Sequence, residues 1–131
     1  MINKKVVFCI PVRNESSNLK SLFKTLDKLY FKFQDYFIIF VESDSSDNSC
    51  DLIKKYLENR KGKLINKNLE GIKNRVIRLA KSRNEYLNFI KNDRNLKTFD
   101  LMIVLDCGGV NGSLTAKKVR KAIIENKNSI G

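Results

Sequence analysis

The chain has 131 residues, of which 42% are hydrophobic, so its length and composition suit one domain with a single core. It has no histidine and three widely spaced cysteines, which excludes histidine-based acid–base catalysis, Ser-His or Cys-His nucleophiles and zinc sites. The 26 Lys and Arg residues outnumber 14 Asp and Glu residues, giving a formal charge of +12. This charge attracts polyanions and phosphorylated small molecules, but it equally fits an ordinary solvated surface.

Short apolar runs bear on where the protein is found. Phe37–Val41 and Leu101–Leu105 are among the longest, and both are far too short to cross a bilayer. The N-terminus lacks the hydrophobic stretch of a signal peptide. We therefore expect a soluble, cytoplasmic protein, and its positive charge adds peripheral contact with the anionic inner face of the membrane as a further expectation.

Strand and helix patterns alternate from the N-terminus onward. Val6–Ile10 predicts a buried strand, which we expect Pro11 to end because proline has no N–H group for an interior ladder. Leucine and aromatic residues then recur every three or four residues from 19 to 33, with lysines on the opposite face. That spacing predicts an amphipathic helix, and Phe37–Val41 predicts the second strand after it.

The next elements are shorter. A helix is expected from about Asn48 to Asn59, with Ser46 or Asp47 as its N-cap. Leu64 and Ile65 then predict a short third strand, after the break that Gly62 introduces.

A longer helix is expected from Ile72 to about Ile90. Its apolar stripe consists of Ile72, Val76, Leu79, Ala80, Leu87 and Ile90. Continuing that spacing places Arg83 on or beside the stripe, where an unpaired guanidinium would be costly. We therefore expect Arg83 to be buried next to an anionic partner.

Leu101–Leu105 predicts the fourth strand, and Asp106 follows at its carboxyl end. A glycine-rich stretch and a final helix from Ser113 to about Asn126 are expected after it. The alternating pattern predicts an α/β fold, a Rossmann-like three-layer α/β/α domain over residues 1–131 with a mostly parallel sheet. Ligands bind such sheets at the carboxyl ends of the strands, so polar residues there are the candidate site.

Two polar segments follow the first two strands. Pro11, Arg13, Asn14 and Glu15 emerge directly after the first strand, although the segment is also typical of a loop that caps the next helix. Glu42 and Asp44 follow the second strand, and their carboxylates suit ribose hydroxyls and the N–H groups of a base. The alternative for this second segment is a set of turns and a helix cap, a role that we assign to Asp47.

The later site candidates carry charge suited to phosphate and metal. Arg75, Arg78, Arg83 and Asn84 lie along one predicted helix, and arginines bind diphosphates well in bidentate geometry. Asp106, at the end of a buried strand, suits Mg²⁺ or Mn²⁺ bound to phosphate oxygens, and the alternative is a cap on the following turn.

The order of these motifs resembles a known family. P-V-R-N-E, V-E-S-D-S-S-D-N-S, R-L-A-K-S-R-N and V-L-D occur in that order between residues 6 and 111. They resemble inverting GT-A glycosyltransferases of the family 2 type, and most closely the cryptococcal capsule-associated mannosyltransferase family and its bacterial relatives.

The resemblance implies roles for the residues that match. Pro11, Arg13, Asn14 and Glu15 would line the nucleotide pocket, Glu42 and Asp44 would read the base or ribose, Arg83 and Asn84 would face the diphosphate and sugar, and Asp106 would open a D-x-D metal motif. Gly108 stands where such a motif has its second aspartate, so the expected Mn²⁺ or Mg²⁺ site is weakened. The resemblance also implies an acceptor half and a general base beyond these residues, supplied by a longer chain, a partner chain or a homo-oligomer.

Three functions follow as hypotheses. The first is sugar transfer from a nucleoside-diphosphate sugar with a divalent metal. The second is a non-catalytic domain that binds a nucleotide or a nucleotide sugar. The third is a basic nucleic-acid-binding module, which rests on charge alone because no aromatic stacking pattern or recognition helix supports it.

Overall fold

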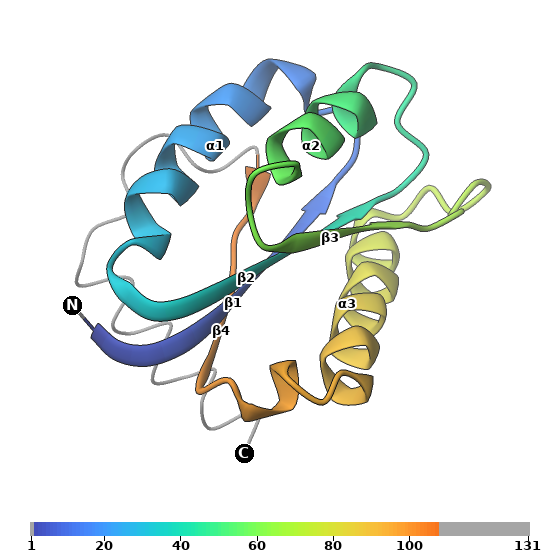
Figure 1. The fold of residues 1–131 in the computed structure, drawn as a ribbon. Helices are drawn as coiled ribbons and strands as arrows, with labels where there is room; N and C mark the ends of the chain where they lie inside the picture. Colours follow the sequence, from blue (N-terminus) through green and yellow to red (C-terminus); the bar gives the residue numbers. More distant parts are fainter. Residues whose placement is uncertain (1, 108–131) are drawn as a thin grey trace.

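A computed structural model describes residues 2–107, so the glycine-rich stretch from Gly108 and the expected final helix lie outside the described residues. Strands and helices alternate as the sequence predicts (Figure 1). The elements are β1 (Ile2–Val12), α1 (Ser16–Tyr30), β2 (Phe33–Glu42), α2 (Ser49–Leu57), β3 (Gly62–Asn66), α3 (Arg75–Asn92), the 3₁₀ helix η1 (Leu96–Thr98) and β4 (Leu101–Val104).

The four described strands form one parallel sheet in the order β3-β2-β1-β4. The chain runs outward from β1 to β3 and then returns to the other side of β1. Because parallel crossovers are right-handed, this reversal puts α1 and α2 on one face and α3 on the other (Figure 1). The prediction of a three-layer α/β/α domain with a parallel sheet is confirmed.

Side chains of β1 alternate between two cores. Phe8 and Ile10 pack under α1 and α2, whereas Val7 and Cys9 pack under α3, and all four are at most 1% exposed. A parallel sheet covered on both faces reads as a continuous apolar run, as this strand does. The predicted stripe of the first helix is confirmed by its buried leucines, Leu19, Leu22, Leu26 and Leu29, but the helix ends at Tyr30 and Phe33 begins β2.

The expectation that Pro11 ends the first strand is wrong. β1 continues through Pro11, which pairs with Val41, to Val12. The carbonyl of Cys9 accepts from Leu105 on the β4 side, whereas the carbonyl of Val12 accepts from Ser43 on the β2 side. Alternation along the strand therefore turns the nitrogen of Pro11 toward β4, which has ended at Val104, so the ladder to β2 loses no donor.

The boundaries and the buried face of the long helix also differ from expectation. Asn74 is the N-cap, since its side chain accepts from the N–H groups of Val76 and Ile77. The buried residues of α3 are Arg78, Ser82 and Tyr86. The predicted stripe faces outward in part, and Val76 is 75% exposed. The expectation that Arg83 is buried is wrong, because the buried line runs one residue before the apolar one and Arg83 is exposed.

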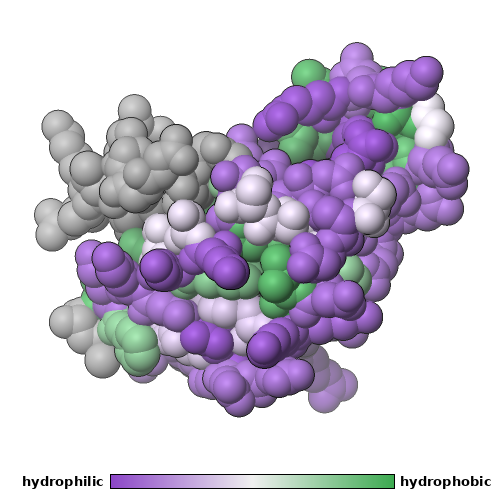
Figure 2. All heavy atoms as spheres, turned by 90° about the horizontal axis from the view of Figure 1, so that it is seen from above, coloured by the Kyte–Doolittle hydropathy of each residue, from purple (hydrophilic) through white to green (hydrophobic). Residues whose placement is uncertain are grey.

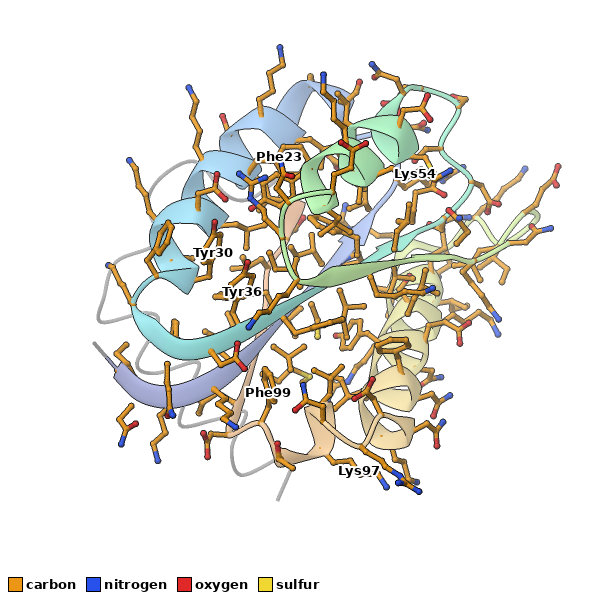
Figure 3. All side chains as sticks on the ribbon, viewed as in Figure 1. Phe23, Tyr30, Tyr36, Lys54, Lys97 and Phe99 are labelled. Carbon is orange, nitrogen blue, oxygen red and sulfur yellow. The ribbon has the colours of Figure 1, made fainter. Side chains whose placement is uncertain are left out.

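The interface between α1 and α2 is held by aromatic and charged groups. Phe23 of α1, labelled in Figure 3, stacks on Tyr56 of α2 with ring centroids 4.0 Å apart. The hydroxyl of Tyr56 donates to Asp27 at 2.7 Å, and Arg60 donates to both oxygens of the same carboxylate at 2.9 Å. Seen from above, the molecule presents a mainly hydrophilic surface (Figure 2). Among the described residues, no helix is long and apolar enough to span a membrane.

Candidate functional site

The sheet has a topological switch point between β1 and β4. These neighbouring strands are parallel, but the chain leaves β1 toward α1 on one face and reaches β4 from α3 on the other. The order of the strands therefore reverses between β1 and β4, and such a point is where open α/β sheets bind ligands. A cleft of about 250 Å³ lies here, lined by Pro11, Val12, Arg13, Glu15, Ser43, Lys73, Arg75, Arg78, Leu79, Ser82 and Asp106.

Six of the residues proposed from the sequence line this cleft: Pro11, Arg13, Glu15, Arg75, Arg78 and Asp106. Sequence reasoning missed Ser43, Lys73 and Ser82. Lys73 was hidden because the helix was expected to begin at Ile72, whereas the residue lies in the loop before α3. A better signal was Asn74, whose type favours an N-cap and would have put Lys73 in the loop.

Two opposite charges that line the cleft form an exposed ion pair. Nη2 of Arg75 lies 3.3 Å from Oδ2 of Asp106, and their side chains are 74% and 63% exposed. An ion pair this exposed to water contributes little to stability. Both groups are therefore accessible to a charged ligand at small energetic cost.

Arg78 is different, because its guanidinium is buried beneath the cleft. Nη1 donates to the carbonyls of Leu69 at 3.0 Å and Ile72 at 2.9 Å, and Nη2 donates to the hydroxyl of Ser43 at 3.1 Å. Nη2 also lies 3.5 Å from Oδ2 of Asp44. Arg78 thus has protein acceptors for its donors, which makes it a link between segments of the chain.

Asn14 joins the loops that follow β1 and β2. Its backbone is left-handed, with φ 50°, and its Oδ1 accepts from the N–H of Ser46 at 2.7 Å. Its own N–H donates to Oγ of Ser45 at 2.8 Å. Asn14 therefore fixes the loop after β1 (residues 13–15) to the loop after β2 (residues 43–48), and we call these two the rim loops. Asn14 is not among the residues that line the cleft.

Asp47 serves the first turns of two helices. Its carboxylate accepts from the N–H of Ser16 at 3.1 Å, at the start of α1, and from that of Ser49 at 3.0 Å, at the start of α2. The hydrogen bond from the Ser49 side chain is the largest cause that lowers the pKa of Asp47, from 3.8 to about 2. The expectation that Ser46 or Asp47 is the N-cap of this helix is wrong, because Asn48 holds that position, but the side chain of Asp47 does accept from the first turn of α2.

Glu42 and Asp44 have protein donors in the structure. The carboxylate of Glu42, in a residue only 6% exposed, accepts from the N–H of Ser45. Asp44 has left-handed backbone, with φ 55°, and its Oδ2 accepts from the N–H of Leu69 at 2.8 Å. Neither lines the cleft, and both hold the loop after β2, so their assignment to base or ribose stays a prediction.

Arg83 and Asn84 lie farther along α3, and both are exposed. Arg83 shares a second hollow of about 370 Å³ with Pro11, Leu79 and Asp106, three residues that also line the cleft. The two hollows therefore adjoin, and Arg83 borders the cleft from the side of β4. Asn84 lines neither hollow, so its predicted contact with a donor sugar stays a prediction.

The carboxylates present fit a metal ion only when a ligand completes the site. The described residues contain no group of three His, Cys, Asp or Glu side chains that could hold a metal. Burial raises the pKa of Cys107 to about 12, so its thiol stays protonated and is a poor ligand at neutral pH. Asp106 remains suitable, because Mg²⁺ is commonly held by one or two carboxylates together with phosphate oxygens and water.

Comparison with known proteins agrees with this architecture. The family described as Glycosyl transferase family 2 matches residues 7–101, which extend from β1 to the first residue of β4. No curated protein matches the chain. The match spans more than half of the 131 residues and includes both rim loops and α3, and the chain therefore belongs to glycosyl transferase family 2.

Proposed function

We propose that the cleft at the switch point binds a nucleoside-diphosphate sugar, and that the domain supplies the donor side of a sugar-transfer reaction. Membership of glycosyl transferase family 2 supports glycosyl transfer in general. The observation that carries the proposal is the lining of the cleft, where Arg13, Lys73 and Arg75 meet Asp106.

The charges in the cleft suit a diphosphate. Arginine presents a planar fork of donors that can bind phosphate oxygens in pairs, and lysine adds a compact positive charge. These cations stabilise the negative charge that grows on the leaving diphosphate as the sugar departs. Arg75 would exchange its partner Asp106 for a phosphate oxygen at little cost, because the pair is exposed.

Asp106 would hold Mg²⁺ or Mn²⁺ together with diphosphate oxygens. When bound, the metal supplies a Lewis acid that further neutralises the leaving group. The carboxylate of Asp106 lines the cleft beside the guanidinium of Arg75, so the metal would lie next to the diphosphate.

Other features of the reaction rest on the sequence resemblance. An acceptor hydroxyl must be deprotonated, and we nominate no general base among residues 2–107. We propose that the acceptor half comes from further chain, a partner chain or a second copy. The narrower resemblance to the capsule-associated mannosyltransferases, a cytoplasmic location and contact with an anionic membrane likewise stay predictions.

Thermal unfolding with and without donors tests the proposal. UDP- and GDP-sugars with Mn²⁺ are expected to raise the melting temperature, since binding to the native state stabilises it. Arg75→Gln should reduce that increase, whereas Lys24→Gln, which removes the same charge from the exposed face of α1, should not. Absence of any increase with every nucleotide sugar would contradict the proposal.

One observation favours binding without turnover as the second candidate. Gly108 stands in place of the second aspartate of a D-x-D motif, which leaves Asp106 as the acidic residue of that motif. This candidate predicts that donors bind and are neither hydrolysed nor transferred. Detection of free sugar or transferred sugar with the purified chain would reject it.

A further inference from the structure

Arg78 joins three segments that border the cleft, because it lies in α3 and its buried guanidinium reaches the loop after β2 and the loop between β3 and α3. The side chain is 9% exposed and reaches Ser43 after β2 as well as the loop between β3 and α3. Its own backbone N–H donates to the carbonyl of Asn74 in the first turn of α3. A buried arginine with several protein acceptors is costly to disturb, so these contacts fix the spacing of the three segments.

Leu69, in the loop, is held from both sides. Its N–H donates to Oδ2 of Asp44 at 2.8 Å, and its carbonyl accepts from Nη1 of Arg78 at 3.0 Å. The residue is 2% exposed. Oδ2 of Asp44 and Nη2 of Arg78 also form an ion pair at 3.5 Å. The loop is therefore held by both members of an ion pair.

Lys73, at the end of the loop, and Arg75, the first residue of α3, bring two cations to the cleft. Lys73 and Arg75 follow Ile72, whose carbonyl Arg78 holds at 2.9 Å, and they flank Asn74, the N-cap of α3. The chain is thus fixed on both sides of Lys73 by the same arginine, once through its side chain and once through its backbone. Loss of the guanidinium would release the loop and let Lys73 and Arg75 move away from Arg13 and Asp106.

We propose that Arg78 is a positioning residue that sets the cationic wall of the cleft, and that it acts on a bound diphosphate through Lys73 and Arg75. This assignment replaces the sequence-based expectation that Arg78 itself contacts the diphosphate. It rests on the proposed function only for the identity of the molecule bound.

The first test measures the loop without any nucleotide. Hydrogen exchange at the amides of Leu69 and Ile72, which both donate hydrogen bonds, should accelerate in Arg78→Met by about tenfold or more. Arg60→Met is the matched control. Arg60 also donates to a carboxylate and a carbonyl, but it lies just after α2 and does not line the cleft. Unchanged exchange at both amides in Arg78→Met would overturn the proposal.

The second test measures affinity for UDP and for GDP, each with Mn²⁺, well below the melting temperature of every variant. Arg78→Met and Arg78→Lys should weaken binding by about tenfold, since neither side chain places one donor nitrogen at the loop carbonyls and a second at Ser43, as the guanidinium does. Arg60→Met should lower the melting temperature and leave the dissociation constant unchanged. An affinity of Arg78→Met equal to that of the unmodified chain would overturn the proposal.

A double-mutant cycle separates positioning from direct contact. When Lys73→Gln and Arg75→Gln are already present, adding Arg78→Met should weaken the affinity by less than about twofold, because the groups that Arg78 positions are gone. A full additional tenfold loss in that background would show direct contact with phosphate and would overturn the proposal. If the unmodified chain binds no nucleoside diphosphate, the proposed function fails, and the exchange measurement still decides whether Arg78 holds the loop.

Discussion

The two sides of the sheet solve the same packing problem differently. On one side, α1 buries four leucines and its polar groups pair with those of α2, as Asp27 does with Tyr56 and Arg60. On the other side, α3 buries Arg78, Ser82 and Tyr86 and leaves apolar residues at the surface. The first side follows the rule that apolar residues lie inside, and the second departs from it where the candidate site lies.

The polar side of the sheet is also the side on which α3 borders the cleft. Arg78 and Ser82 both line the cleft and both lie in the buried line of α3, so one face of the helix serves packing and the site together. The α1 and α2 side has no such demand within the described residues and can pack for stability alone. We therefore expect substitutions on the two sides to separate stability from binding.

The largest expected effect is on the side of α1. Leu22→Ala removes a fully buried side chain and should lower the free energy of unfolding by about 2–5 kcal/mol. Leu79→Ala on α3 is the matched change, and it should cost clearly less because Leu79 is 40% exposed. Chemical denaturation of both variants measures the difference, and equal losses would remove the contrast between the two sides.

A smaller effect is expected from Tyr56→Phe. The change removes the hydroxyl that donates to Asp27 at 2.7 Å and keeps the ring stacked on Phe23. The loss should be about 1 kcal/mol, typical of one hydrogen bond. Binding of UDP with Mn²⁺ should be unaltered, and a weaker affinity would show that the α2 side also contributes to the site.

The capping carboxylate of Asp47 should make stability depend on acid. Its pKa in the folded chain is about 2, against 3.8 in an unfolded chain, so its ionised form stabilises the fold at pH values above 3.8. That stabilisation is lost as the pH falls from 3.8 to about 2. The melting temperature of the unmodified chain should therefore approach that of Asp47→Asn over this interval, and a constant difference between the two would contradict the assignment.

The smallest effect is expected on the outer face of α3. Val76→Ser should change the free energy of unfolding by no more than about 0.5 kcal/mol, because Val76 is 75% exposed. Denaturant titration checks this value. A loss as large as that of a core substitution would show that this residue is covered in the full chain.

The sequence predicts the fold well because local patterns of apolar residues mark most of its strands and helices. The apolar runs of β1, β2 and β4 and the leucine stripe of α1 each mark an element that the structure contains. Parallel strands in turn place their exits on one rim, which is why Arg13, Arg75 and Asp106 could be expected together. These inferences needed only spacing and residue type.

The remainder depends on contacts between distant segments. The apolar stripe on α3 predicts that Arg83 is buried, whereas the buried arginine is Arg78. Its guanidinium is satisfied by the carbonyls of Leu69 and Ile72, and no rule of residue spacing indicates that these acceptors lie there. The continuation of β1 through Pro11 likewise follows from the early end of the neighbouring β4. In both cases a partner far along the chain satisfies the residue that local rules reject.

The link between the two rim loops has a consequence for how this domain can vary. Asn14 accepts from Ser46, and Asp47 accepts from Ser16, so each loop supplies acceptors that the other needs. A length change in one loop would leave N–H groups of the other without their acceptors and would disturb the start of α1. A chimaera that exchanges the segment after β1 must therefore exchange the segment after β2 together with it.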